Sequence, residues 1–272
     1  MHIRWAHAAI VAVLAVPAFA RAEAPAFTWP DGQRAAVSLA YDDALESQLD
    51  TAIPALDRHG LKGSFYLIMA AEPVQRRMQD WRAAAANGHE LGNHSLFHQC
   101  SGKGPGREWV APQRDLDTTS VAQMRDQLVV ANTLLQALDG ARERTFTAPC
   151  GDLQASDGPY IAAVKDQFVG IKLVGGALVE DMRTLDPHAV PVTAPVGSSG
   201  AELIALVEEA GRRGTMVNFT FHGIGGDHLS VSAEAHEQLL AYLAAHRDRY
   251  WTATFVEQMR WVRAQQAAHA PR

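Results

Sequence analysis

The chain has 272 residues, enough for one large domain or two small ones, and its 47% hydrophobic content can bury a sizeable core. Lys and Arg total 24 against 30 Asp and Glu, which gives a net charge of −6. Because the chain contains no block of basic residues, nucleic acid is not expected as a partner.

The N-terminal residues have the pattern of a secretory signal. Arg4 gives a positive start, an apolar stretch runs from Ala8 to Ala20, and small residues around Ala20 and Ala22 suit cleavage. An N-terminal membrane anchor is the alternative, but the stretch is short for the ~20 residues that a span needs. We therefore expect residues 1–22 to be removed and the protein to be exported, periplasmic or extracellular, without a stable membrane span.

Strand-like and helix-like segments alternate along the rest of the chain. Apolar runs predict strands at 35–41, 63–68, 90–94, 145–149, 168–174, 189–192, 216–222 and 251–254. Helical spacing of apolar residues predicts helices at 45–59, 73–86, 120–138, 159–166, 202–213 and 232–246, followed by an amphipathic tail helix. These are roughly seven βα units, an alternation that favours α/β architecture with a parallel sheet closed as a barrel. Residues 23–32 are expected to be an extended lead-in, and 33–272 a single domain with a C-terminal helix.

Acidic and imidazole side chains follow several of these predicted strands. Asp42 and Asp43 end the first apolar run, His94 and His98 follow a short strand, and His222 follows another apolar run. Because α/β barrels place their chemistry at the carboxyl ends of their strands, we expect these side chains to share one metal site. The four-residue spacing of His94 and His98 would place both imidazoles on one side of a helical turn. At a strand end, one Asp can bind metal while the other stays free as a base.

His89 and Glu90 raise the alternative of a zincin-type metalloprotease. That motif requires a second His four residues after the first, and the chain has Asn93 there. His89 is therefore expected to be a structural or supporting group.

Taken in order, these segments resemble the motifs of the polysaccharide deacetylase family with the NodB homology domain (carbohydrate esterase family 4). The stretch 40–44 (Ala-Tyr-Asp-Asp-Ala) corresponds to the family's Thr-Phe-Asp-Asp-Gly. The stretch 88–98 closely matches the second and most specific motif, Gly-His-Glu-x-Gly-x-His with a further His, and 220–222 corresponds to the closing motif. The resemblance covers about residues 33–262 and implies a distorted (β/α)7-type barrel of the NodB kind.

The resemblance also implies roles for the site residues. Asp43, His94 and His98 would bind the metal, Asp42 would be the base, and His222 the acid. Two imidazoles and one carboxylate leave coordination positions open for water and substrate, as in catalytic sites. Such a ligand set suits one divalent metal ion, with Zn²⁺ expected first and Co²⁺, Ni²⁺ or Mn²⁺ as substitutes.

The implied activity is metal-dependent removal of acetyl groups from an acetylated oligo- or polysaccharide. An N-acetyl amide is favoured over an O-acetyl ester, although both reactions pass through the same intermediate and the site residues do not separate them. Two alternatives stay open: a non-catalytic glycan-binding protein on the same scaffold, and a metallohydrolase that cleaves a non-sugar amide. The sequence does not indicate an oligomeric state.

The third motif departs from the family pattern. The family often has Phe-Arg-Pro-Pro-Tyr-Gly, whereas residues 146–151 read Phe-Thr-Ala-Pro-Cys-Gly. Thr147 thus replaces the arginine that holds the base, and Cys150 replaces the tyrosine, although the Cys150 backbone N–H can still serve the oxyanion. Lys172, the lone charge in its apolar strand, is the hypothesised partner of Asp42. A solvent-exposed lysine at a strand end is the alternative.

The substrate contacts are less defined by the sequence. Thr220 stands where the family usually has an apolar residue beside the acetyl group, and Phe221 or Ile224 are two open choices for lining that pocket. Aromatic residues can form sugar-stacking surfaces, and Trp109, in a loop rich in Gly and Pro, is the expected substrate contact; Trp81 and Phe97 are further candidates.

Two cysteines, Cys100 and Cys150, each lie within a few residues of a candidate site segment. Export would make a disulfide between them chemically possible. The bridge would close a loop of about 50 residues, worth about 4 kcal/mol in the chain-entropy view. Two buried free thiols are the alternative.

Overall fold

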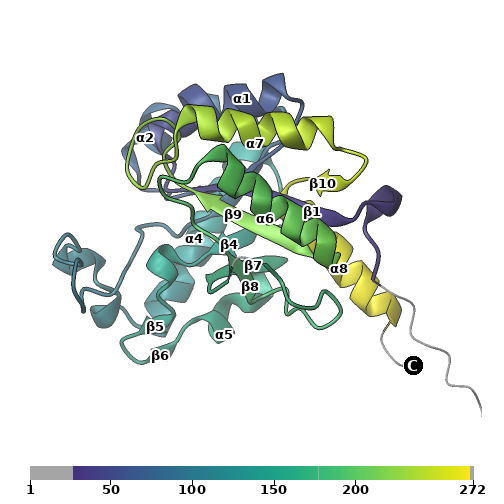
Figure 1. Cartoon of the computed structure of the whole chain (residues 1–272). Coiled ribbons are helices and arrows are strands. Elements are labelled where there is room, and N and C mark those ends of the chain that lie inside the picture. The colour runs from purple at the N-terminus through teal and green to yellow at the C-terminus, as the bar shows by residue number, and fades with distance from the viewer. Residues whose placement is uncertain (1–26, 177, 270–272) are drawn as a thin grey trace, which may run out of the picture.

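The computed structural model describes residues 27–176 and 178–269, so the expected signal segment, residues 1–22, lies outside the described part. A parallel sheet curls into a nearly closed barrel with helices packed around it (Figure 1). Its strands are β1 (Ala35–Asp42), β2 (Ser64–Leu67), β3 (Glu90–Asn93), β4 (Thr145–Thr147), β7 (Gly170–Val174), β8 (Val190–Val192), β9 (Met216–Phe221) and β10 (Tyr250–Thr252). A separate small antiparallel pair is formed by β5 (Gln154–Ala155) and β6 (Gly158–Pro159).

The strand order confirms the predicted barrel of parallel strands. Neighbours run β1-β2-β3-β4-β7-β8, and β9 pairs with the other side of β1. Two backbone hydrogen bonds join the end of β8 to β9: Thr193 N donates to Asn218 O at 2.9 Å, and Thr220 N donates to Thr193 O at 2.8 Å. β10 pairs with the start of β1, beside β2, and so lies outside the ring of strands.

The helices follow the predicted alternation. They are α1 (Ile53–Arg58), α2 (Glu72–Arg76), α3 (Met78–Ala86), α4 (Val121–Asp139), α5 (Ile161–Val164), α6 (Gly200–Arg213), α7 (Ala233–Ala245) and α8 (Phe255–His269). A π-helical segment, η2 (Gln48–Ala52), precedes α1, and short 3-10 turns are η1 (Pro30–Gly32), η3 (Pro112–Arg114), η4 (Leu116–Thr118), η5 (Pro149–Gly151) and η6 (Lys165–Gln167). Ser120 and Ser199 form capping boxes at α4 and α6, and left-handed Gly214 ends α6. Among the described residues, no helix is long and apolar enough to cross a membrane.

The helix predicted over 73–86 is two helices in the structure. Arg77 (φ −116°, ψ 32°) lies between α2 and α3 with a non-helical backbone. Its guanidinium forms an ion pair with Asp80 in α3, and ion pairs with Glu46 and Asp50 anchor this point of the chain to the segment before α1. The apolar periodicity alone does not contain that ion-pair network, so it did not predict the break.

The two faces of the strands bury different side chains. On β1, Val37, Leu39 and Tyr41 face outward and pack with the apolar sides of α6 and α7, which cover β1 and β9 in Figure 1. The alternate residues face the barrel interior, where small and polar side chains replace the usual large aliphatic ones. Asp42 and Lys172 are two of these interior residues. The alternation of side chains along the strands therefore places two charged groups inside the barrel.

The amino-terminal end of the barrel is closed by α8. The N–H of Phe255 donates to Ser64 Oγ at 2.8 Å, at the start of β2. Met259 reaches β7, where a Cβ on Gly170 would meet Met259 Cγ at 2.5 Å. With this end filled by apolar side chains, the open end of the barrel is the carboxyl one.

Candidate active site

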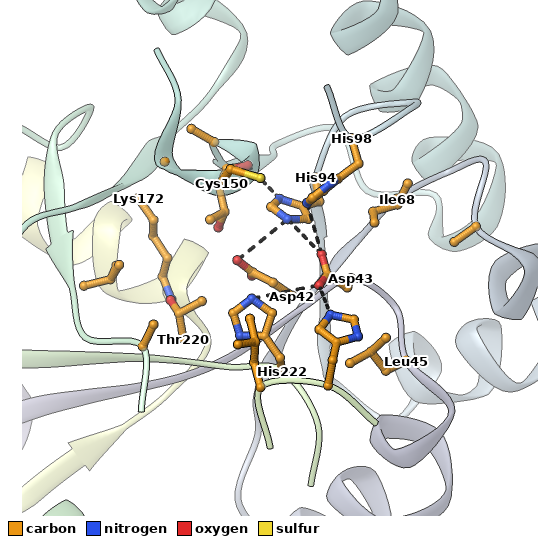
Figure 2. A pocket seen from close by; sticks show the side chains of 18 of the residues that line it. Asp42, Asp43, Leu45, Ile68, His94, His98, Cys150, Lys172, Thr220 and His222 are labelled. Atoms are coloured by element: carbon orange, nitrogen blue, oxygen red, sulfur yellow. Dashed lines mark hydrogen bonds and ion pairs between the residues drawn. The ribbon is translucent and has the colours of Figure 1, made fainter. Parts of the chain in front are cut away.

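A pocket of about 800 Å³ opens at the carboxyl ends of the barrel strands. Figure 2 shows the charged and imidazole side chains gathered at its centre. Its polar lining comes from five strands or the turns and loops that follow them: Asp42, Asp43, His94, His98, Thr147, Lys172, Thr220, His222 and His228. All five residues predicted for the metal and the proton transfers therefore lie in one neighbourhood.

The three predicted metal ligands converge. Asp43 Oδ1 lies 3.2 Å from His94 Nε2 and 3.3 Å from His98 Nε2, and one ligand atom from each residue lies within 4.8 Å of the other two. Within the part of the chain that the structure describes, this Oδ1 is buried without a hydrogen-bond partner. An unsatisfied carboxylate oxygen facing two imidazoles is a donor set that fits a divalent cation of the zinc type.

The two histidines reach this position through a loop, so the expectation that a helical turn pairs them is wrong. Residues 94–99 contain no helix. Ser95 (φ 66°) and His98 (φ 55°) adopt left-handed backbone conformations. Asn93 Oδ1 accepts the N–H of Ser95 at 2.7 Å, and Ser95 Oγ accepts that of His98 at 2.8 Å. Asp43 is also left-handed (φ 81°). Strained conformations of non-glycine residues concentrate at functional sites.

Hydrogen bonds behind the ligands set their orientation. His94 Nδ1 lies 2.8 Å from Thr147 O, so Nδ1–H donates to this carbonyl and Nε2 is left to bind a cation. Behind His98, the Cys100 Sγ atom lies 3.6 Å from Nδ1. The structure joins Cys100 to Cys150 in a disulfide, which ties the His98 loop to the turn after β4. The supports of both histidines therefore involve the segment 147–150.

Asp42 and His222 flank the three ligands without contacting them closely. Asp42 Oδ2 lies 3.9 Å from His94 Nε2, and His222 Nε2 lies 3.9 Å from Asp43 Oδ2. Gln48 fastens the two strand ends together, because its Nε2 donates to Asp42 O at 2.5 Å and to His222 O at 3.2 Å. The geometry thus leaves one carboxylate and one imidazole available for proton transfer.

Burial and charge move the two adjacent carboxylates in opposite directions. Burial raises the pKa of Asp42, although His94, His222 and Lys172 oppose it. Burial also raises the pKa of Asp43, but the imidazoles around it outweigh that effect and hold it well below the ordinary value. Paired groups whose environments separate their pKa values mark a division of roles.

The imidazoles are shifted as well. Burial lowers the pKa of His94, but Asp42 and Asp43 outweigh it and raise the pKa to about 9. Burial lowers the pKa of His222, against the raising influence of the same two carboxylates. The Nδ1 atom of His222 is buried and has no hydrogen-bond partner among the residues that the structure describes.

The comparisons with known proteins agree with this arrangement. The family model described as polysaccharide deacetylase matches residues 30–164, which include Asp42, Asp43, His94 and His98. The chain belongs to the polysaccharide deacetylase family. Among solved structures, a putative polysaccharide deacetylase from Mycobacterium smegmatis has a TM-score of 0.62 at 18% identity, covering 92% of this chain and 98% of its own. The peptidoglycan deacetylase PdaC from Bacillus subtilis has a TM-score of 0.55 at 16% identity, covering 88% and 96%.

One curated relative also matches part of the chain and indicates no activity. A gellan lyase from a Bacillus species is 28% identical over 123 residues, or 45% of this chain. The chain spans only 4% of the length of that protein. The solved structures, at under 20% identity, show the fold: a nearly closed (β/α)7 barrel with helices around it.

Within this family member, the unusual third motif lies at the pocket wall. Thr147 ends β4 and lines the pocket, and Cys150 follows in a turn with a left-handed backbone (φ 57°). Lys172 lines the same pocket and is fully buried, so it is not a solvent-exposed lysine at a strand end. The usual arginine position is therefore occupied by a short neutral side chain, while a buried cation lies on the neighbouring strand.

The aromatic residues considered as substrate contacts lie in different places. Trp109 lines the pocket with 59% of its surface exposed, and its ring lies 6.4 Å from that of His98. Trp81 is fully buried in the core and does not line the pocket. Phe221 and Ile224, the two choices for the acetyl pocket, both pack in the layer outside the barrel. The apolar pocket wall instead includes Leu45, Ile68, Pro73, Val192 and Leu229.

One imidazole of the site was missed by the sequence reasoning. His228 Nε2 donates to Asp43 Oδ2 at 2.8 Å and lines the pocket. It lies in the loop after β9, where Asp227 (φ 62°) and Leu229 (φ 48°) are left-handed. The glycine-rich stretch after His222 was the available signal, but no periodicity or motif singles out position 228. His89, by contrast, is a structural group as expected, with Gly63 N donating to its Nδ1 at 3.1 Å.

Proposed function

We propose that this protein is a divalent-metal-dependent deacetylase that removes acetyl groups from an acetylated carbohydrate. The convergence of Asp43, His94 and His98, with Asp42 and His222 on either side, is the observation that carries the proposal. Membership of the polysaccharide deacetylase family supports the reaction type. The proposal assigns the reaction to a single catalytic domain over residues 33–272.

Each side chain has a role that its position supports. A cation held by Asp43, His94 and His98, Zn²⁺ in the first instance, supplies Lewis acidity that polarises the acetyl carbonyl and lowers the pKa of a water. Asp42 takes the proton of the attacking water, and burial brings its pKa closer to the working pH. His222 donates a proton to the leaving amine or hydroxyl. The backbone N–H of Cys150, at the pocket wall, stabilises the oxyanion.

The proposed substrate and location rest on separate observations. An N-acetyl amide of an amino sugar is proposed ahead of an O-acetyl ester, with Trp109 at the pocket mouth stacking on a sugar ring. The Cys100–Cys150 disulfide supports an oxidising compartment, as does the signal-like N-terminus, so the protein is proposed to act in the periplasm or outside the cell.

Acetate release tests the proposal directly. Chitooligosaccharides, peptidoglycan and acetylxylan are incubated with the purified protein, with chelator, and with chelator followed by Zn²⁺. We expect release that stops with chelator and returns with the metal. Asp43→Ala, which removes a proposed ligand, should retain neither metal nor activity, whereas Asp42→Asn should retain metal and lose activity.

The two alternatives give different results in the same assay. A glycan-binding protein would bind metal and an oligosaccharide in calorimetry but release no acetate from any substrate. A hydrolase of non-sugar amides would also release none from the three glycans, yet would hydrolyse simple acetanilides in a metal-dependent way. Release from acetylxylan alone would make the protein an esterase.

A further inference from the structure

Lys172 is a cation buried inside the barrel. Its side chain has no solvent exposure, and in the described part of the chain its Nζ atom has no hydrogen-bond partner. The ammonium lies 4.8 Å from the ring centre of Phe255 and 5.3 Å from that of Tyr66. Cation–π contacts of this kind stabilise a charge only partly. An unpaired buried ammonium is costly, so its retention needs a reason.

Two carboxylates act on this charge. Burial lowers the pKa of Lys172 to about 8, while Asp42 and Glu90 both raise it. Glu90 already has its partners: Ser64 Oγ donates to Oε2 at 2.7 Å, the N–H of Val256 donates to the same oxygen at 2.9 Å, and Thr145 Oγ1 donates to Oε1. Asp42 Oδ1, in contrast, is buried without a partner among the described residues. Of the two carboxylates, Asp42 is therefore the one that keeps an oxygen without a hydrogen-bond donor.

The strand register turns Lys172 into the pocket that Asp42 also lines. Lys172 on β7 is the direct partner of Thr147 on β4, and paired residues of parallel strands project from the same face of the sheet. Thr147 is the shorter side chain of this pair, and its Oγ1 lacks a hydrogen-bond partner among the described residues. Figure 2 shows Lys172 extending toward the side of the pocket that holds Asp42, Thr220 and His222.

We propose that Lys172 is a positioning residue, whose ammonium is the countercharge that holds the Asp42 carboxylate in the pocket beside the metal ligands. It acts through its charge across the pocket, because no acceptor lies within hydrogen-bond distance of Nζ in the described chain. The consequence for catalysis rests on the proposed function, in which Asp42 is the base. The charge pairing itself does not depend on that function.

A double-mutant cycle of thermal stability, measured with Zn²⁺ bound, tests the pairing without substrate. The cycle compares Lys172→Met, Asp42→Asn and the double variant. We expect the double variant to melt at least about 3 °C above the temperature that the two single shifts predict by addition, because each single change leaves one charge uncompensated. The matched cycle replaces Asp42→Asn by Glu90→Gln, and there we expect additive shifts.

Two outcomes would overturn the proposal. If the melting shifts of Lys172→Met and Asp42→Asn add, while those of Lys172→Met and Glu90→Gln do not, Lys172 is the countercharge of Glu90 and not of Asp42. Additivity in both cycles would make it a spectator. Because these melts use no substrate, a failure of the proposed deacetylase activity leaves their result intact.

Kinetics then test the consequence for the reaction. On whichever acetylated glycan the wild type hydrolyses, Lys172→Met should lower kcat about 10²-fold, as expected when a reacting group loses its position. KM and the affinity for Zn²⁺ should change less than about threefold, since no hydrogen bond joins the Lys172 ammonium to the proposed ligands in the described part of the chain. A fall in Zn²⁺ affinity that parallels the fall in kcat would contradict a positioning role, because it would indicate general damage to the site.

Discussion

The Nε2 atom of His228 lies 2.8 Å from Asp43 Oδ2, the carboxylate oxygen that His94 and His98 do not approach. Asp43 Oδ2 is thus fixed from the loop after β9, while Oδ1 faces the two proposed histidine ligands without a hydrogen-bond partner among the described residues. Partners that hold a ligating carboxylate from behind restrict its orientation and tune its affinity for the metal.

Removing this partner should weaken metal binding. We expect His228→Ala to lower the affinity for Zn²⁺ by about 10- to 100-fold, the usual loss for an outer partner of a ligand. His228→Gln, which retains a donor, should recover part of it. Competition with a chromophoric chelator measures the affinity. His188→Gln is the control, because His188 bonds to Phe168 O at the other end of the barrel. Unchanged affinity in His228→Ala would show that the loop contact does not support the site.

Without metal, the protein should lose stability as pH rises from 6.5 to 8. The carboxylates beside His94 raise its pKa to about 9 in the folded chain, from an ordinary value of 6.5. A raised pKa contributes stability that is complete below pH ~6.5 and is lost as pH rises through the folded value. Measurement up to pH 8 captures about 2 kcal/mol of this loss and limits the opposing gain in stability from Lys172, whose pKa is lowered to about 8 and which begins to deprotonate in this interval.

Urea unfolding of chelated protein at pH 6.5, 7.2 and 8.0 measures this dependence. The Zn²⁺-loaded protein is the internal control, because imidazole must be neutral to bind metal and the proton is then already gone. Stability of the chelated protein that stays constant or rises over this interval would contradict the assignment of a charged His94 beside Asp43.

Reducing the Cys100–Cys150 disulfide should destabilise the fold and the site together. The bridge spans 50 residues, so its loss should cost about 4 kcal/mol, or a fall in melting temperature of about 8–16 °C. It also anchors the segments behind His98 and His94, so Zn²⁺ affinity should fall. Melts with and without reductant measure the first effect. A Cys100→Ser/Cys150→Ser variant, which should ignore the reductant, is the control. Equal melting temperatures of reduced and oxidised protein would remove the disulfide from this role.

The barrel and most of the site could be predicted from the sequence because both depend on local patterns. Apolar runs that alternate with segments of helical periodicity are typical of buried parallel strands with helices outside them. The predicted strand bounds agree with the structure to within a few residues. Asp42, Asp43 and His222 follow two such runs, so topology alone brings them to one end of the barrel.

The remaining features depend on tertiary contacts that no periodicity records. The His94–His98 pairing uses two left-handed residues in a loop and not a helical turn, and spacing alone does not distinguish the two. His228 is brought to Asp43 by an irregular loop. The break at Arg77 follows from ion pairs with residues of the preceding segment. In each case the decisive partner is distant in the chain or the backbone angle is rare.

The Tyr66 ring, which contacts the Lys172 ammonium, packs closely against Gly92 on the neighbouring strand β3. This contact gives a further prediction. A Cβ on Gly92 would lie 2.5 Å from two carbons of the Tyr66 ring, which is fully buried and fixed by a hydrogen bond to Thr145 Oγ1 at 2.9 Å. Gly92→Ala should therefore cost about 1–3 kcal/mol, the usual penalty for overpacking a filled core.

The same substitution should also lower activity, since the displaced ring is one of the two that contact the Lys172 ammonium. Chemical denaturation and acetate release measure the two effects. Gly226→Ala is the matched control, because a Cβ there would meet nothing within 4 Å. If both variants unfold at the same denaturant concentration, the Tyr66 ring has room to move. Close packing of Gly92 against that ring would then not be what positions the Lys172 ammonium.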